Sequence, residues 1–297
     1  MKKIVVFDYG SQYNHLITRR IRDFGVYSEL WNPELDIKKI QNDNDILGII
    51  LSGGPNSIYK QDLTNLDKTL FGLGIPILGI CYGMQLIASV FGAKIIPAKS
   101  REYGRVTINV NPSNSLLFEG VNPETDVFMS HKDMIETPPQ GFVVDAKSQA
   151  CPIAAFHQAN TKIYGVQFHP EVVHTSEGNK ILKNFVFGIC KSEPNWSMDN
   201  FIAEEIIRIK EITNGKKVLL GLSGGVDSTV AAVLLYKAIG EKLTCMLVDH
   251  GLLRKDEVES VTNSLKNKFS MQVVVVDAKK RFLDKLSNVT DPEKKRK

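Results

Sequence analysis

The chain is poor in cysteine, and its cysteines lie far apart. The four are Cys81, Cys151, Cys190 and Cys245, spread over 297 residues without a C-x-x-C pair. This spacing argues against a metal knuckle and against a disulfide framework. Free thiols persist in a reducing compartment, so we expect a cytoplasmic protein.

The chain also lacks long apolar runs and a strong excess of one charge. No run approaches the roughly 20 residues that span a bilayer, and Met1-Lys2-Lys3 leads directly into a strand-like segment rather than a secretory leader. The net charge is +4, without a basic stripe typical of nucleic-acid binding. We therefore expect small-molecule partners, with no membrane and no nucleic acid. The basic end, Lys294–Lys297, is either solvated or part of a polyphosphate or nucleotide site.

What is present is a repeated alternation of apolar strands and helical patterns. Hydrophobic residues make up 43% of the chain, which is enough for two domains with separate cores. The first part predicts strands at 3–7, 26–31, 47–51 and 76–80, and helices at 12–24, 63–73 and 84–91. Such alternation predicts a doubly wound, mostly parallel sheet.

Residues 105–167 have a different pattern, with short β-rich segments separated by Pro, Asn and Gly. They predict an antiparallel edge, at 106–110, 127–129, 142–145 and 153–156, followed by the last core strand at 163–168. A closing helix is expected at 177–189. The domain is therefore expected to cover residues 1–190.

The second part repeats the α/β order after a short polar stretch at 191–198, which we expect to be a linker. A helical pattern at 202–212 precedes strand 217–222, helix 228–239, strand 243–248, helix 256–268, strand 272–276 and helix 279–287. Residues 199–297 are therefore expected to form a second α/β domain, also with a doubly wound, mostly parallel sheet.

A lone cysteine stands between a strand and a helix in Gly79-Ile80-Cys81-Tyr82-Gly83. The small residues at 79 and 83 allow a sharp turn that exposes the side chain, as in the G-x-S-x-G elbow with sulfur in place of oxygen. The turn predicts a nucleophilic thiol. The alternative is a cysteine buried at the end of a strand.

A histidine and a glutamate follow another core strand, in Phe168-His169-Pro170-Glu171. Pro170 keeps the segment extended, so side chains 169 and 171 lie on the same side. A base that faces a thiol and is oriented by a carboxylate is the arrangement of a catalytic triad. A strand-end histidine with a structural partner is the alternative. After a third strand, the glycine amides of Ser52-Gly53-Gly54-Pro55 could hold an oxyanion.

The set S-G-G-P, G-I-C-Y-G-M-Q and Q-F-H-P-E, in this order, resembles the class I glutamine amidotransferases over nearly all of residues 1–190. The resemblance implies a flavodoxin-like fold, with Cys81 as nucleophile, His169 as general base and then acid, and Glu171 as its orienter. It also implies that an oxyanion and glutamine site is formed by Gly53, Gly54, Tyr82, Gln85, Ser130 and His131. The family reaction forms a γ-glutamyl thioester, releases ammonia and then hydrolyses the thioester.

A second centre, Ser223-Gly224-Gly225-Val226-Asp227-Ser228, lies between an apolar strand and a helical pattern. Its glycines permit close backbone approach, and its hydroxyls and helix N-terminal amides suit an anion. Asp227 could bring Mg²⁺ to phosphates. The G-K-[ST] ending of a Walker loop is absent. An ordinary strand–turn–helix with a polar cap is the alternative.

This loop resembles that of the N-type ATP pyrophosphatases, which have an adenine-nucleotide α-hydrolase-like fold and split ATP into AMP and pyrophosphate. The resemblance implies an ATP site made of Ser223, Gly224, Gly225, Val226, Asp227, Ser228, Thr229 and, beside the adenosine, Val248. The segment Asp249-His250-Gly251 is by itself also consistent with a polar turn.

The two centres together resemble the glutamine-hydrolysing GMP synthase family, which are ligases of purine biosynthesis. The resemblance implies that ATP with Mg²⁺ adenylates xanthosine 5′-monophosphate (XMP) and that ammonia from the Cys81 site displaces AMP. It also implies that Arg296 lies near the nucleotide phosphate. The family continues into a dimerisation domain, so we expect a C-terminally truncated, monomeric chain of a homodimeric protein. We expect this chain to hydrolyse glutamine but not to form GMP efficiently.

Two other functions remain open. Another glutamine-dependent ATP pyrophosphatase synthetase, such as one acting on a nicotinate dinucleotide, would usually carry a nitrilase-type Glu-Lys-Cys glutaminase, which we do not find. A non-catalytic glutamine or nucleotide sensor would be indicated by loss of Cys81, His169 or Asp227, and all three are present.

Overall fold

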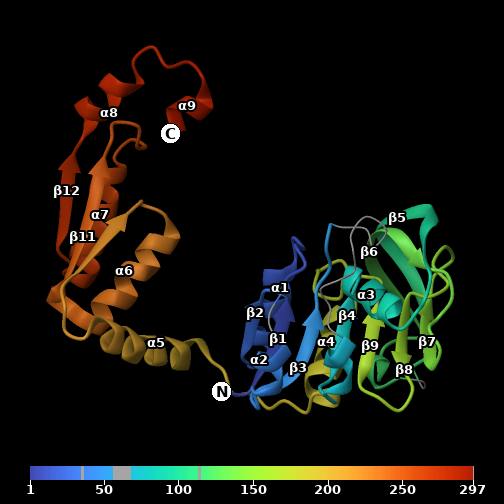
Figure 1. Cartoon of the computed structure of the whole chain (residues 1–297). Coiled ribbons are helices and arrows are strands. Elements are labelled where there is room, and N and C mark those ends of the chain that lie inside the picture. Colours follow the sequence, from blue (N-terminus) through green and yellow to red (C-terminus); the bar gives the residue numbers. More distant parts are fainter. Residues whose placement is uncertain (35–36, 56–67, 113–114, 297) are drawn as a thin grey trace. The chain divides into compact units, whose positions relative to one another are not determined.

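The computed structural model describes residues 1–34, 37–55, 68–112 and 115–296. They form two compact units, Met1–Ser197 and Met198–Lys297, each of which is an α/β fold (Figure 1). The predicted fold class is confirmed, because each unit has its own largely or wholly parallel sheet. Within these ranges no helix has both the length and the apolar composition needed to cross a bilayer.

The first unit contains a nine-stranded sheet in the order β2-β1-β3-β4-β9-β8-β7-β5-β6. The parallel part consists of β1 (Lys3–Phe7), β2 (Ser28–Trp31), β3 (Ile46–Leu51), β4 (Ile77–Ile80) and β9 (Ile163–Val166). The antiparallel part consists of β5 (Ile95–Val110), β6 (Glu124–Ile135), β7 (Phe142–Lys147) and β8 (Ala155–Gln158). The predicted antiparallel edge is confirmed. Strands β5 and β6 are longer than predicted because they pair through polar segments as well as apolar ones.

Alternation along the strands builds one core on each face of this sheet. Ile4 and Val6 of β1 belong to one buried cluster, and Val5 and Phe7 belong to the other, as a period of two requires. The helical elements of the unit are α1 (Asn14–Asp23), α2 (Ile37–Gln41), α3 (Tyr82–Val90), α4 (Gly178–Lys183), the 3-10 turns η2 (Lys68–Gly72) and η3 (Leu116–Phe118), and the π-helical η4 (Asn184–Ile189).

Three helical segments differ from the sequence-based expectation. Residues 63–67 of the helix predicted at 63–73 lie outside the described residues, and the rest contains the 3-10 turn η2 rather than an α-helix. The helix predicted at 177–189 changes from α to π geometry after Lys183. Helix α2 was not predicted, because five residues with one buried side chain, Ile40, show no periodicity.

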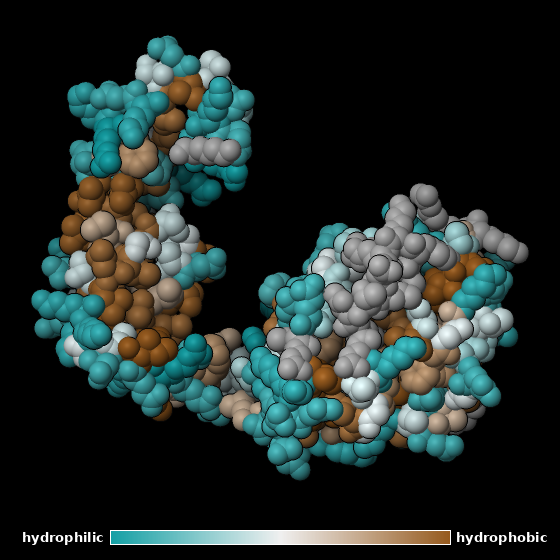
Figure 2. All heavy atoms as spheres, in the orientation of Figure 1, coloured by the Kyte–Doolittle hydropathy of each residue, from teal (hydrophilic) through white to brown (hydrophobic). Residues whose placement is uncertain are grey.

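The second unit has a three-stranded parallel sheet in the order β10-β11-β12. Its elements are α5 (Met198–Thr213), β10 (Val218–Leu222), α6 (Val226–Ile239), η5 (Gly240–Lys242), β11 (Leu243–Asp249), α7 (Glu257–Phe269), β12 (Val273–Asp277), α8 (Lys279–Leu286) and α9 (Pro292–Arg296). Apart from the short η5 and α9, the predicted order is confirmed. Apolar side chains reach the surface of this unit (Figure 2), and Leu219, Val274 and Val275 are among the exposed ones.

Two glycines allow α3 to follow β4 closely. A Cβ on Gly79 would lie 2.6 Å from the backbone of Gly83, and a Cβ on Gly83 would overlap the carbonyl oxygen of Leu51 in β3. Backbone atoms in a central strand cannot move aside as the end of a flexible side chain can. The close approach of helix and sheet therefore requires glycine at both positions.

We expect Gly83→Ala to lower the free energy of unfolding of the first unit by about 1–3 kcal/mol, the usual effect of overpacking. Urea denaturation followed by circular dichroism measures this. Gly188→Ala is the matched control, because a Cβ there meets nothing within 4 Å. Equal denaturation midpoints for the two variants would contradict the steric argument.

Candidate active site

Three strand ends of the first unit meet at one edge of the sheet. Residue Leu51 of β3 pairs with Gly79 of β4, and Ile80 of β4 pairs with Val166 of β9. Because the strands are parallel and in register, the segments that follow them emerge side by side. They border a cavity of about 570 Å³ whose lining includes Gly54, Cys81, Tyr82, Gln85, Tyr103, Ser130, His131, Lys132 and His169.

Cys81 lies at the turn between β4 and α3 in a sparsely populated backbone conformation, with φ 52° and ψ −104°. A non-glycine residue with positive φ costs free energy and persists only where its surroundings enforce it. Its amide donates to the carbonyl of Val166 at 2.8 Å, which fixes the turn to β9. The geometry is that of a nucleophile elbow, with the sulfur at the cavity.

His169 and Glu171 form a buried pair. Nδ1 of His169 lies 2.8 Å from Oε1 of Glu171, which is fully buried. Thr175 holds the segment by donating from Oγ1 to the His169 carbonyl at 2.6 Å. The edge-on ring of Tyr13, 5.1 Å away between centroids, packs against the imidazole. Since Nδ1 is engaged by Glu171, Nε2 is the atom left to face Cys81.

The surroundings of His169 make it a strong base. Burial alone would disfavour the imidazolium, but the charge of Glu171 and hydrogen bonds with Cys81 and Glu171 outweigh it and raise the pKa of His169 from 6.5 to about 10. A base of this strength can accept the thiol proton of Cys81 and hold it until a leaving group needs it.

Backbone amides near Cys81 could receive a developing oxyanion. Tyr82 is the first residue of α3, so its amide has no helical acceptor. A Cβ on Gly53 would lie 3.1 Å from Cε1 of His169, and one on Gly54 would lie 2.7 Å from the carbonyl oxygen of Tyr9. Glycine at both positions lets this loop lie close to the His169 ring and to the backbone of Tyr9.

The opposite wall of the cavity comes from β6. Ser130 and His131 line it, and the carbonyl oxygen of Ser130 lies 3.6 Å from the Cys81 sulfur. Gln85, from α3, donates from Nε2 to the carbonyl of Asp133 at 3.0 Å. The structure thus brings the residues predicted for the first site into one place.

The sequence reasoning missed Gln167. It is fully buried, and its Nε2 donates to the Cys81 sulfur at 3.7 Å. A signal was available, because positions 167, 169 and 171 lie on the same side of one extended segment.

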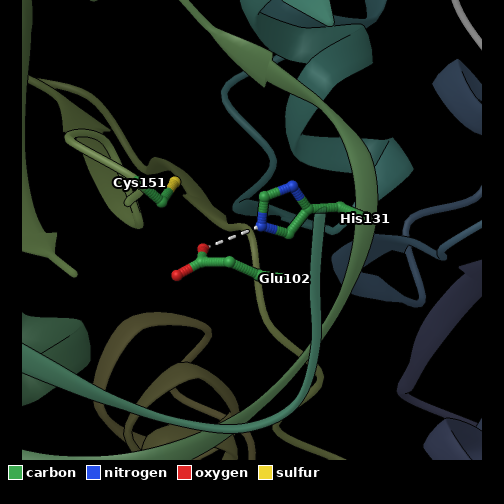
Figure 3. A group of neighbouring side chains, drawn as sticks. All are labelled: Glu102, His131 and Cys151. Carbon is green, nitrogen blue, oxygen red and sulfur yellow. Dashed lines mark hydrogen bonds and ion pairs between the residues drawn. The ribbon is translucent and has the colours of Figure 1, made fainter. Parts of the chain in front are cut away.

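Glu102, His131 and Cys151 form a buried group behind this wall (Figure 3) whose potential ligand atoms lie within 4.8 Å of one another. Nε2 of His131 lies 3.2 Å from Oε2 of Glu102, and the Cys151 thiol donates to the Ile153 carbonyl at 3.3 Å. Burial raises the pKa of Cys151 to about 12. Because the thiol keeps its proton and these groups already have hydrogen-bond partners, they fit a hydrogen-bonded network better than a metal site.

The second predicted centre lies between β10 and α6. Gly224 has φ +80°, and Gly225 precedes the first helical residue, Val226. The hydroxyls of Ser228 and Thr229 donate to the carbonyl of Gly225 at 3.1 and 2.9 Å. The first amides of α6 have no acceptor within the helix, so they are available to an anion.

Three other residues with predicted roles in the second unit lie on different elements. Asp227 is an exposed carboxylate in the first turn of α6. Val248 lies near the end of the neighbouring strand β11. Arg296, expected near the phosphate of the nucleotide substrate rather than in this loop, lies in α9, where it pairs with Glu293 at 2.7 Å.

Comparison with known proteins identifies the family to which the chain belongs. The family profile Glutamine amidotransferase class-I matches residues 5–189. The chain belongs to the class I glutamine amidotransferase family. The family profile NAD synthase matches residues 198–295.

Individual relatives match both units. A glutamine-hydrolyzing GMP synthase of Geobacillus kaustophilus is 57% identical over 99% of this chain, and one of Listeria innocua is 54% identical over 100% of it. The chain spans 57% of the length of each. The crystal structure of a Thermoplasma acidophilum protein, assigned as one subunit of a GMP synthase, has a TM-score of 0.60 at 36% identity. That match covers 64% of this chain and 94% of the Thermoplasma acidophilum chain.

We expect Glu171→Gln to lower the pKa of His169 from about 10, because burial then acts without the opposing carboxylate charge. Nitrogen NMR of the imidazole over a pH series measures this. The folded pKa lies above the ordinary 6.5. The pairing therefore stabilises the wild type fully below that pH, and the stabilisation is lost as the pH rises toward about 10.

Glu136→Gln is the control for that substitution. Glu136 pairs with Lys94 on the surface at 3.0 Å, so its loss removes the same charge away from the imidazole. An unchanged His169 titration in Glu171→Gln would show that Glu171 is not the cause of the shift.

Proposed function

We propose that the first unit hydrolyses glutamine, with Cys81 as nucleophile, His169 as base and acid, and Glu171 as its orienter. The observation that carries this proposal is the buried His169–Glu171 contact of 2.8 Å beside a cysteine in a strained turn. Membership of the amidotransferase family agrees with it.

The steps follow from these positions. Nε2 of His169 takes the thiol proton as the Cys81 sulfur attacks the side-chain carbonyl carbon of glutamine. The same proton then passes to the departing nitrogen, and ammonia leaves behind a γ-glutamyl thioester. His169 next takes a proton from water, whose oxygen attacks the thioester, and returns it to sulfur. Glutamine and water thus give glutamate and ammonia, with the enzyme restored.

The cavity supplies the remaining parts of this reaction. Amides at Gly53, Gly54 and Tyr82 would stabilise the oxyanion of each tetrahedral intermediate. Gln85, Ser130 and His131 would bind the rest of the glutamine. Both amide protons of Gln85 are engaged within the protein, so Oε1 is the atom with which it would accept a hydrogen bond from the substrate.

We propose further that the whole protein makes GMP from XMP. Curated relatives that match both units are named glutamine-hydrolyzing GMP synthase. The loop 223–229 would bind the phosphates of ATP, Asp227 would hold Mg²⁺, and Val248 would lie at the adenosine. Adenylation of the purine oxygen makes a good leaving group, which ammonia then displaces as AMP. A phosphate contact of Arg296, a homodimer and a cytoplasmic location remain predictions.

An NAD synthase-like activity is the second candidate, because that profile matches the second unit. The match concerns the ATP-using unit alone, whereas the GMP synthases match the amidotransferase unit as well. Assays with XMP and with a nicotinate dinucleotide, on a protein of the relatives' full length, separate the two.

We expect Cys81→Ala to reduce glutamate release from glutamine by more than about 10³-fold, because Cys81 is the only thiol among the described residues that line the cavity. Release is measured with and without ATP, Mg²⁺ and XMP, so that any coupling between the units is included. Cys245→Ala, which removes a buried thiol of the second unit, serves as the control and should keep full activity. Glutamate release by Cys81→Ala at the wild-type rate would exclude the proposed nucleophile.

We expect Asp227→Asn to weaken ATP binding about tenfold or more when Mg²⁺ is present, because a charged metal contact is lost. In EDTA the same variant should bind ATP as well as the wild type or better, because a carboxylate near phosphates then only repels them. Calorimetry in both buffers measures this. Asp284→Asn, at an exposed ion pair of α8, is the control, and equal losses in the two buffers would argue against a metal role.

A further inference from the structure

A continuous line of hydrogen bonds joins the Glu102–His131 pair to the sulfur of Cys81. Nδ1 of His131 lies 3.1 Å from the carbonyl oxygen of Asp133, and Nε2 of Gln85 lies 3.0 Å from the same oxygen. Gln85 also contacts Oε1 of Gln167 at 3.1 Å, and Nε2 of Gln167 contacts Cys81 at 3.7 Å.

One backbone carbonyl fixes the direction of every bond in this line. The oxygen of Asp133 can only accept, so Gln85 must turn its NH₂ group toward it. That group also faces Gln167, which must therefore present its oxygen to Gln85 and its own NH₂ to the sulfur. A flipped amide at either position would place two acceptors or two donors face to face. The geometry therefore makes Gln167 a donor to Cys81.

The far end of the line is fixed by the same carbonyl. His131 must carry a proton on Nδ1 to donate to this oxygen, and its Nε2 lies 3.2 Å from Oε2 of Glu102. Ser148 completes the pair by donating to Oε1 of Glu102 at 2.9 Å. Figure 3 shows the contact between Glu102 and His131. Because this end is buried and braced, the Asp133 carbonyl is held in place.

We propose that Gln167 is a further catalytic residue of the glutaminase site, whose amide N–H stabilises negative charge on the Cys81 sulfur. The charge forms when the thiol proton moves to His169, and again when the thioester breaks and sulfur leaves. A hydrogen bond to a charged group is stronger than one to a neutral group. The donor therefore favours both charged species over the neutral thiol. This inference rests on the proposed function, in which Cys81 is the nucleophile.

The test is the rate at which iodoacetamide alkylates Cys81 at pH 7, followed by mass spectrometry of its peptide. Gln167→Leu keeps most of the volume but removes the donor, and we expect alkylation to slow about tenfold or more. Gln167→Glu places a carboxylate oxygen toward the sulfur, and we expect a larger loss. Glutamine turnover should fall in kcat more than it rises in KM.

Alkylation needs no glutamine and no ATP, so this test can fail while the proposed function stands. Gln158→Leu is the matched control, since Gln158 contacts Thr161 away from the cavity, and it should alkylate at the wild-type rate. Wild-type alkylation rates in folded Gln167→Leu or Gln167→Glu would overturn the proposal. A role limited to packing would change the melting temperature and KM but leave alkylation unchanged.

A measurement on the wild type covers the case in which both variants fail to fold. The side-chain amide proton of Gln167 should move upfield in NMR spectra when Cys81 is alkylated, because its hydrogen bond to the Cys81 sulfur is then lost. A signal that does not move, or that moves downfield, would overturn the proposal.

Discussion

The in-register parallel pairing of β3, β4 and β9 brings the turn at Cys81, the loop at Gly53 and the segment at His169 to one edge of the sheet. Each group leaves its strand at the carboxyl end, so no long side chain or distorted strand is needed to bring them together. The fourth wall comes from β6, which is remote in strand order. Backbone hydrogen bonds from His169 to Phe128 at 3.0 Å and from Ser176 to Asp126 at 2.9 Å fasten it beside the triad segment.

Burial and charge act together on the base. Oε2 of Glu171 is buried and, among the described residues, has no hydrogen-bond partner. An under-solvated carboxylate is costly, and its favourable interactions are concentrated on His169 through Oε1. The same contact that orients the imidazole therefore also strengthens it as a base. Additional hydrogen bonds to the Glu171 carboxylate would stabilise it, but Glu171 would then raise the pKa of His169 less.

The sequence was sufficient to predict where the strands lie, because alternating and continuous apolar runs determine which faces of a strand are buried. It also predicted that the side chains of His169 and Glu171 lie on the same side of their segment, because an extended segment with Pro170 has few conformations. It places Gln167 on the same side as His169 and Glu171, but it does not show the contact with Cys81, since that partner depends on which strand lies opposite. Nor could it reveal the π-helical end at Asn184–Ile189, because helical periodicity predicts the buried face and not the hydrogen-bond step.

The two candidate sites are prepared for their ligands in different ways. In the first, Cys81, Gln85 and His169 are nearly inaccessible to solvent. These side chains are therefore already desolvated by folding, before any ligand binds. In the second, Ser223, Gly225 and Asp227 are exposed, and the loop holds its shape through its own hydroxyls. Oγ of Ser223 lies 3.1 Å from Oγ of Ser228. Preorganisation reduces the ordering cost of binding in both. A neutral amide can enter the buried site without losing a charged hydration shell, whereas a polyanion such as ATP is better bound at exposed amides that its own charge and a cation can approach.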